Sequence, residues 1–191
     1  MERIGLFGGS FDPVHLGHLL VAQAAFEELQ LSRLVFIPAA QSPFKPDTQP
    51  APGAIRLRML RLALAGQSHY QVDDQELKRG GTSFTIDTVR HYVARYPSAP
   101  LFYLIGADHI SQLPKWREAE ELARSVEFVV IPRPGVSAVS APAPFRLRGL
   151  QGFPLGVSSS QIRARVRAGL PIQPLVPVAV AEVIRNSKLY L

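Results

Sequence analysis

The sequence predicts an α/β fold, a Rossmann-like, doubly wound parallel sheet with a small C-terminal helical region. Short apolar runs of strand length alternate with segments of helical periodicity, which is the pattern of βαβ units. The run LFYLIGAD at 101–108 is apolar along most of its length, as a strand covered on both faces is. Two glycines follow the first apolar run, at the point where a parallel strand passes into a helix.

The first half of the chain alternates strands and helices. In the first helix Val21, Ala25 and Leu29 fall on one face, and Gly66 ends the second helix. In order, we expect a strand at 3–9, a helix at 17–29, a strand at 33–39, a helix at 54–66, a strand at 70–77 and a helix at 83–97.

The second half begins with the buried strand. We then expect helical stretches at 109–116 and 117–126, a strand at 127–132, a short strand near 152–157, a helix at 159–168 and a last helix within 176–187. The segments 39–53 and 133–146 are rich in Pro, Ala and Ser and predict long loops. Loops of that length inside a compact domain are usually functional lids or flexible segments.

Length and composition indicate a globular protein. A chain of 191 residues can bury a sizeable core, so we expect a single domain over 1–191. No apolar run approaches the roughly 18 residues of a membrane span, and the start MERIGLFGG does not match a signal peptide. We therefore expect a cytoplasmic protein with no membrane partner. The absence of cysteine excludes disulfides and thiolate metal sites.

The formal net charge of +6 allows an anionic partner, either a nucleic acid or a phosphate-rich metabolite. Most of the excess is arginine scattered over helices, as in RLRMLRLAL and IRARVRAG, which favours a solvated basic face. The chain carries no RRM, KH or zinc-finger signature. We therefore expect no nucleic-acid partner.

The stretch GGSFDPVHLGH at 8–18 carries more polar chemistry than a turn requires. Its glycines let backbone N–H groups approach a phosphate, and the next helix points its positive N-terminus there. It matches neither G-x-x-x-x-G-K-[ST] nor G-x-G-x-x-G. His15 and His18 lie on one face at the helix start, where they can donate to one anion and gain charge near neutral pH. The alternative is an Asx-type turn at Asp12, with histidines that cap or pack.

This stretch resembles the H-x-G-H signature of the nucleotidylyltransferase superfamily. Later stretches stand in the order found in bacterial nicotinate-nucleotide adenylyltransferases, and the similarity covers essentially the whole chain. The chain departs from that pattern twice. The loop usually written P-P-H-K has Phe44 in place of the histidine, and S-S-T-x-I-R is SSSQIR at 158–163, which keeps a hydroxyl. The later stretches are FIPAAQSPFK, ELKRGGTSFTIDTV, LIGADHISQLPKW, VIPRPG and VSSSQIRARVRAGLPIQPLVP.

The resemblance implies an enzyme of NAD biosynthesis that joins nicotinate mononucleotide and ATP, giving nicotinate adenine dinucleotide and pyrophosphate. The attacking phosphate is already ionised, so the protein needs no general base; it has to hold two anions in line and stabilise developing charge. Mg²⁺ would arrive bound to ATP, without dedicated protein ligands. A homo-oligomer is left open.

The resemblance also implies roles for residues at the two ends of the chain. His15, His18 and Arg163 would be catalytic, with both imidazoles around the α-phosphate. The serines from Ser158 would supply an N-cap and free hydroxyls, and Lys45 would close over the phosphates. The alternatives are an ordinary serine cap with a surface arginine, and a solvated loop lysine. The implied ATP-binding residues are Gly8, Gly9, Ser10, Phe11, Lys45, Gly106, Asp108, Ser158 and Ser159.

On the mononucleotide side, Trp116 would stack on the pyridinium ring, although a lone tryptophan is often a core residue. Thr85 would present its hydroxyl and backbone N–H to the nicotinate carboxylate, or would only cap a helix. Asp108 suits ribose hydroxyls. Arg133 would meet the mononucleotide phosphate, with a surface arginine as its alternative.

Two other functions stay open at this stage. A related adenylyltransferase could use nicotinamide mononucleotide or phosphopantetheine as acceptor, although SFTIDT and GADHISQLPKW favour nicotinate. A basic α/β module could bind RNA or a dinucleotide without catalysis. That module would show salt-sensitive RNA binding and no turnover.

Overall fold

The computed structural model describes residues 2–44, 49–132, 142–153 and 155–191. Within them, strands form one parallel sheet in the order β3-β2-β1-β4-β5-β6, which confirms the predicted fold class. The order reverses between β1 and β4, and a crevice forms at that point, at the carboxyl ends of the strands. The strands are β1 (Ile4–Gly9), β2 (Arg33–Pro38), β3 (Tyr70–Val72), β4 (Leu101–Gly106), β5 (Glu127–Ile131) and β6 (Leu147–Gly149).

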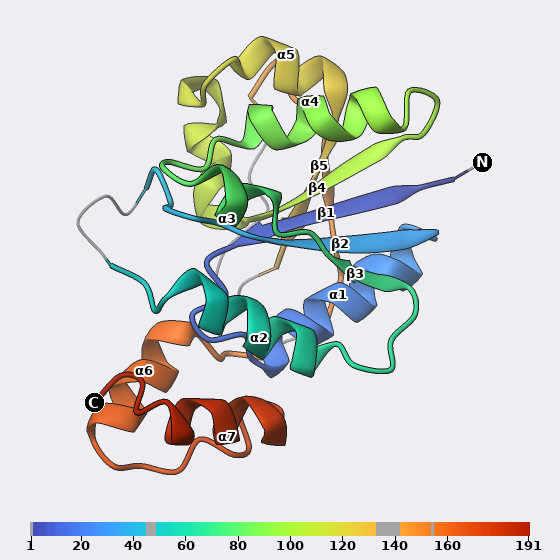
Figure 1. The fold of residues 1–191 in the computed structure, drawn as a ribbon. Coiled ribbons are helices and arrows are strands. Elements are labelled where there is room, and N and C mark those ends of the chain that lie inside the picture. Colours follow the sequence, from blue (N-terminus) through green and yellow to red (C-terminus); the bar gives the residue numbers. More distant parts are fainter. Residues whose placement is uncertain (1, 45–48, 133–141, 154) are drawn as a thin grey trace.

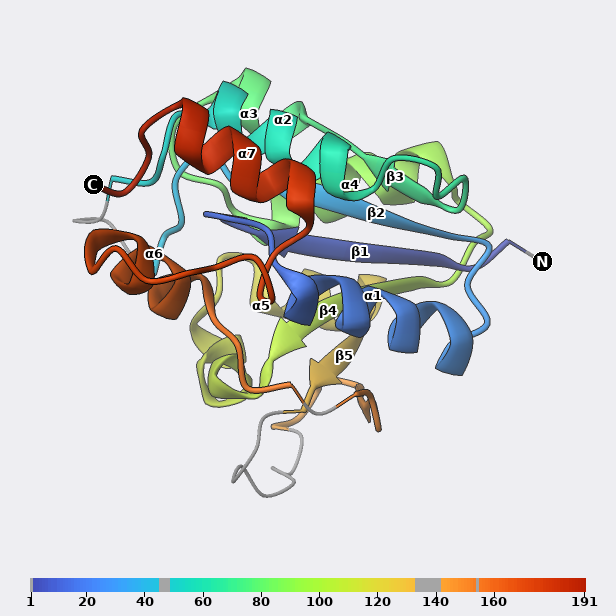
Figure 2. The same ribbon diagram turned by 90° about the horizontal axis from the view of Figure 1, so that it is seen from below.

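Helices cover both faces of the sheet. Figure 1 shows α4 and α5 on one face of the sheet. The helices α1, α2, α6 and α7 lie on the side of the opposite face. Figure 2 shows α7 beside α2, and in both views α6 lies beyond the carboxyl end of β1. The helices are α1 (Leu16–Glu28), α2 (Gly53–Ala63), α3 (Gln75–Arg79), α4 (Thr85–Arg95), α5 (Ala119–Ser125), α6 (Ser159–Arg167) and α7 (Val178–Asn186), with a 3₁₀ segment η1 (Ala107–Lys115).

The alternation of side chains along each strand divides the core into two layers. In β2, Leu34 and Phe36 pack in the cluster that includes buried residues of α1, α2 and α7. Val35 and Ile37 of the same strand pack in the cluster that includes α4 and α5. Successive side chains of a strand point to opposite faces, so a strand buried on both faces has to be apolar throughout. None of the described helices is long and apolar enough to cross a membrane.

Two predicted strands need correction. The strand expected at 70–77 ends at Val72, because the Asp73 carboxylate accepts the backbone N–H of Gln75 at 2.9 Å and the chain turns into α3. The strand expected near 152–157 is wrong for the described residues there. The edge strand is β6, in which Arg148 pairs with Glu127 of β5 at 2.7 Å.

Candidate active site

A cleft of about 870 Å³ opens where the strand order reverses, at the carboxyl ends of β1 and β4. Two stretches far apart in the sequence line it, the β1–α1 turn and the start of α6. Lys45 and Arg133 lie outside the described residues. All the other predicted site residues line this cleft, namely Gly8, Gly9, Ser10, Phe11, His15, His18, Thr85, Gly106, Asp108, Trp116, Ser158, Ser159 and Arg163.

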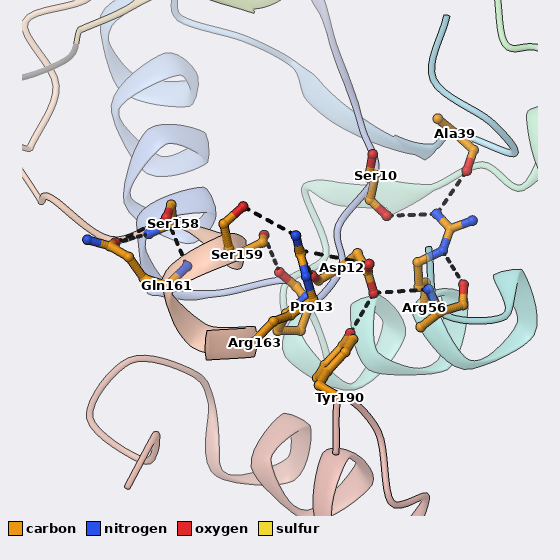
Figure 3. Close-up of polar contacts among 12 residues, drawn as sticks. Ser10, Asp12, Pro13, Ala39, Arg56, Ser158, Ser159, Gln161, Arg163 and Tyr190 are labelled. Atoms are coloured by element: carbon orange, nitrogen blue, oxygen red, sulfur yellow. Dashed lines mark hydrogen bonds and ion pairs between the residues drawn. The ribbon is translucent and has the colours of Figure 1, made fainter. Parts of the chain in front are cut away.

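Direct hydrogen bonds join the β1–α1 turn to α6 (Figure 3). The Ser159 hydroxyl donates to the backbone carbonyl of Pro13 at 2.9 Å. The Arg163 guanidinium donates to the backbone carbonyl of Asp12 at 2.7 Å, and it lies 3.9 Å from the carboxylate of the same residue. Two stretches far apart in the sequence therefore form one wall of the cleft.

The serines at the start of α6 are engaged within the protein. The Ser158 hydroxyl accepts the backbone N–H of Gln161 at 3.3 Å, and the Gln161 side chain accepts the backbone N–H of Ser158 at 2.9 Å. This capping box confirms Ser158 as the N-cap. The expectation of a free hydroxyl is wrong for Ser159, which donates to Pro13. The Ser160 hydroxyl accepts from Arg163 at 3.2 Å, and this bond leaves its own proton to donate.

His15 and His18 lie together at the start of α1, as the spacing predicts. Their rings stack with centroids 3.7 Å apart, and the His18 Nδ1 accepts the backbone N–H of His15 at 3.2 Å. Burial lowers the pKa of His15 to about 4 and also lowers the pKa of His18, which the neighbouring His15 lowers further. The lowered pKa values contradict the expectation that the two rings gain charge near neutral pH. With Nδ1 accepting, the neutral His18 ring carries its proton on Nε2, which makes Nε2 the donor atom of the ring.

The glycines at the end of β1 leave room for aromatic side chains. A Cβ added to Gly8 would lie 2.4 Å from the Tyr103 hydroxyl, and one added to Gly9 would lie 3.2 Å from the Phe11 ring. Phe11 is buried, and its ring centroid lies 5.0 Å from that of His18. Because Gly8 and Gly9 have no Cβ, the rings of Tyr103 and Phe11 can pack against the end of β1, where both line the cleft.

The opposite side of the cleft carries Thr85 and Trp116. Thr85 begins α4, and its hydroxyl lies 3.4 Å from that of Tyr103. The Trp116 ring packs against Phe128 at 5.9 Å and against Phe44 at 5.6 Å between centroids. The indole Nε1–H is buried and has no hydrogen-bond partner within the described chain. Trp116 therefore belongs to the core on one side and to the cleft wall on the other.

A buried arginine, which sequence reasoning missed, organises the loops of the cleft. Arg56 of α2 is 1% exposed and donates to the backbone carbonyls of Ser10 at 2.7 Å and Ala39 at 2.8 Å. It thereby holds together the loops that follow β1 and β2. Arg56, Met59 and Leu60 are spaced i, i+3 and i+4 on the buried face of the helix, and this spacing is the signal that could have identified it.

Sequence reasoning also missed Glu76, Tyr190 and the hydrogen bonds that the Asp12 carboxylate accepts from outside its own turn. Glu76 lines the cleft and is 4% exposed, and burial raises the pKa of its carboxyl group although Thr88 donates to it at 2.5 Å. Tyr190 donates to the Asp12 carboxylate at 2.6 Å. Nothing in the local sequence of Tyr190 indicates a place beside the cleft, whereas Glu76 is the first residue of the stretch ELKRGGTSFTIDTV.

The arrangement is chemically suited to an anion. The N-termini of α1 and α6, the Arg163 guanidinium and the His18 Nε2–H are donors that belong to one cleft. The described residues contain no group of three or more His, Cys, Asp or Glu side chains placed to hold a metal ion.

Comparisons with known proteins show which families and folds this chain is similar to. Residues 6–165 match the family model described as cytidylyltransferase-like. A probable nicotinate-nucleotide adenylyltransferase of Opitutus terrae is 42% identical, covering 98% of this chain and 97% of its own. One from Shouchella clausii is 43% identical, covering 100% and 97%. The fold matches that of Plasmodium falciparum nicotinic acid mononucleotide adenylyltransferase complexed with NaAD, with a TM-score of 0.82 and 18% identity, over 100% of this chain and 98% of that one.

Proposed function

The chain belongs to the cytidylyltransferase-like family and, within it, to the nicotinate-nucleotide adenylyltransferases, and on this premise we propose the reaction that it catalyses. The 5′-phosphate of nicotinate mononucleotide attacks the α-phosphate of ATP, and pyrophosphate leaves. The product is nicotinate adenine dinucleotide, an intermediate of NAD biosynthesis. One observation carries the proposal: the turn of residues 8–18 and the start of α6 line a single cleft and are joined by the bond from Arg163 to Asp12.

We assign the ATP triphosphate to the space between the N-termini of α1 and α6. There the neutral His18 ring donates from Nε2 to the α-phosphate, beside His15, and the Arg163 guanidinium stabilises the negative charge that develops as pyrophosphate leaves. The backbone from Gly8 to Phe11 lines the same space. Lys45 is assigned to the phosphates in the same proposal. No protein group has to remove a proton, because the attacking phosphate is already an anion at neutral pH.

Mg²⁺ enters this reaction as part of the substrate, bound to ATP, and neutralises phosphate charge. The chain's own contribution is to bind the complex and orient it. The Asp12 carboxylate accepts a hydrogen bond from Tyr190 and lies beside the Arg163 guanidinium. We therefore assign it a structural role and do not assign it to the ion.

We assign the nicotinate ring to the face of Trp116 and its carboxylate to the start of α4 at Thr85. Both residues line the cleft opposite the histidines. Asp108 and Gly106, at the end of β4, are assigned to the nucleotide sugars, and Arg133 to the mononucleotide phosphate. We place the reaction in the cytoplasm, in a single domain over residues 1–191.

The test is pyrophosphate release with MgATP and a panel of acceptors: nicotinate mononucleotide, nicotinamide mononucleotide and phosphopantetheine. We expect kcat/KM to be greatest with nicotinate mononucleotide. A preference for either of the other acceptors would replace the proposed substrate while keeping the reaction class. Salt-sensitive RNA binding with no turnover on any acceptor would contradict the enzyme altogether.

A further inference from the structure

We propose that Tyr190 is a positioning residue for this reaction: through Asp12 it fixes the turn of residues 10–13 and the guanidinium of Arg163. The inference rests on the proposed function and assigns a part in it to the segment that follows α7. Tyr190 does not line the cleft, so its effect on the reaction has to pass through the residues that it holds.

The Asp12 side chain is the point at which separate segments of the protein meet. It is 6% exposed, and its Oδ1 accepts the Tyr190 hydroxyl at 2.6 Å and the backbone N–H of Ala51 at 3.3 Å. Its Oδ2 lies 3.9 Å from Arg163, which also donates to the Asp12 carbonyl at 2.7 Å (Figure 3). The turn, the segment leading into α2, the start of α6 and the segment after α7 are thus joined at one residue.

Tyr190 is itself held firmly. It is partly buried and packs against the core, and Leu189 beside it donates its backbone N–H to Ile184 of α7 at 3.0 Å. The backbone φ of Tyr190, 65°, lies in the left-handed region that residues other than glycine rarely adopt. Burial raises the pKa of the Tyr190 hydroxyl, and the hydrogen bond to Asp12 raises it further, so the hydroxyl stays protonated and donates. A buried charge that keeps good donors is stable in place, whereas one that loses a donor is costly.

The consequence for the reaction follows from the two oxygens of the carboxylate. When Oδ1 is fixed by Tyr190 and Ala51, Oδ2 faces the Arg163 guanidinium, and the carbonyl of the same residue binds that guanidinium as well. Without the hydroxyl, the carboxylate can rotate and the guanidinium loses a fixed neighbour. A transferring phosphate needs its partners placed to within a fraction of an ångström, so loss of the Tyr190 hydroxyl has to slow the reaction.

The test compares Tyr190→Phe with a matched control, Tyr92→Phe. The Tyr92 hydroxyl also donates to an aspartate, Asp73, at 2.8 Å, but neither residue lines the cleft. We expect both variants to lose similar stability in urea unfolding, while Tyr190→Phe lowers kcat about tenfold and Tyr92→Phe keeps kcat within about twofold of wild type. Equal kcat losses in the two variants would show that Tyr190 only stabilises the fold, and would overturn the proposal.

A double-mutant cycle tests the route through Arg163. We expect Tyr190→Phe to change kcat by less than about twofold when Arg163 is already alanine, because the group that the tyrosine positions has been removed. A full tenfold loss in that background would contradict the route.

Calorimetric MgATP binding adds a readout that does not depend on the acceptor. We expect Kd to rise about threefold to tenfold in Tyr190→Phe and to stay at the wild-type value in Tyr92→Phe. If wild type failed to turn over with nicotinate mononucleotide, the proposed function would fail, and this comparison would still decide the role of Tyr190. An unchanged Kd together with an unchanged kcat would refute that role.

Discussion

The rings of His15 and His18 stack with 3.7 Å between centroids and 29° between planes, and both belong to the start of α1. Two charged imidazoles would repel one another at this distance, whereas two neutral rings pack well. Burial favours the neutral forms, as the lowered pKa values of both residues indicate. The pair therefore offers neutral hydrogen-bond donors to the cleft and does not present a fixed positive charge near neutral pH.

Replacing His18 with alanine removes the donor assigned to the α-phosphate. We expect kcat to fall by about 10²–10³, the range for loss of one transition-state donor, with the fold retained. Pyrophosphate release measures the loss. His91→Ala is the control, because His91 lies exposed on α4, away from the cleft, and should leave activity unchanged. A loss of less than about threefold in the His18 variant would remove this residue from the proposed mechanism.

The stability of the protein should fall as the pH drops from about 6.5 towards 4. The pKa of His15 is lowered from its ordinary value of 6.5 to about 4 in the folded chain, so between these values the unfolded state binds more protons. Going from pH 7.5 to pH 5, this residue alone should remove about 2 kcal/mol from the free energy of unfolding.

Urea unfolding at both pH values checks this dependence, with His15→Gln as the comparison. The variant lacks this titration, so it should lose about 2 kcal/mol less than wild type over the same pH interval. An identical pH dependence in the two proteins would show that His15 titrates alike in the folded and unfolded states.

Replacing Arg56 with methionine should destabilise the fold. The change keeps a long side chain but leaves the buried carbonyls of Ser10 and Ala39 without their donor. We expect the free energy of unfolding to fall by about 3 kcal/mol. Arg58→Met on the exposed side of the same helix should change it by no more than about 0.5 kcal/mol. Similar losses in the two variants would contradict the structural role of Arg56.

Replacing Gly8 with alanine should act on the acceptor side of the cleft. The new Cβ would lie 2.4 Å from the Tyr103 hydroxyl, which in turn lies 3.4 Å from Thr85, so the tyrosine ring has to move. We expect KM for nicotinate mononucleotide to rise about tenfold. The double variant Gly8→Ala with Tyr103→Phe removes the closest clash and should recover most of that loss. If it recovered none, the clash would not be the cause.

Replacing Trp116 with alanine should raise KM for the mononucleotide about tenfold and leave KM for ATP within about twofold, because stacking of a cationic ring is lost. Trp116→Phe keeps an aromatic face and should lose less. Steady-state kinetics with each substrate varied in turn separate the two constants. An equal rise for both substrates would count against stacking at this position.

The sheet could be predicted from the sequence wherever burial on both faces demands an unbroken apolar run, as in β1, β2, β4 and β5. Prediction failed at the edges. β6 contains Arg148, whose charge is satisfied by Glu127 on the neighbouring strand, and local sequence does not reveal such pairing. The apolar run at 152–157 resembles a strand, yet Phe153 and Leu155 within it lie exposed at the cleft.

Some residues of the site could likewise be predicted from local sequence, and others could not. The turn of residues 8–18 and the start of α6 carry their chemistry in local motifs, so they could be predicted to share a cleft. The spacing of Arg56 with Met59 and Leu60 could place it on the buried face of α2. Its role could not be predicted, because arginine is rarely fully buried and its carbonyl partners come from two other loops. Tyr190 meets Asp12 only through the tertiary fold. The neutral histidines depend on burial, which the motif alone does not report.

A crystal structure with MgATP in a non-hydrolysable form tests the central claim most directly. The account predicts that the triphosphate lies between the starts of α1 and α6, with the α-phosphate in hydrogen-bond contact with His18 Nε2 and the Arg163 guanidinium on a phosphate oxygen. A triphosphate bound outside this cleft, touching neither residue, would contradict it.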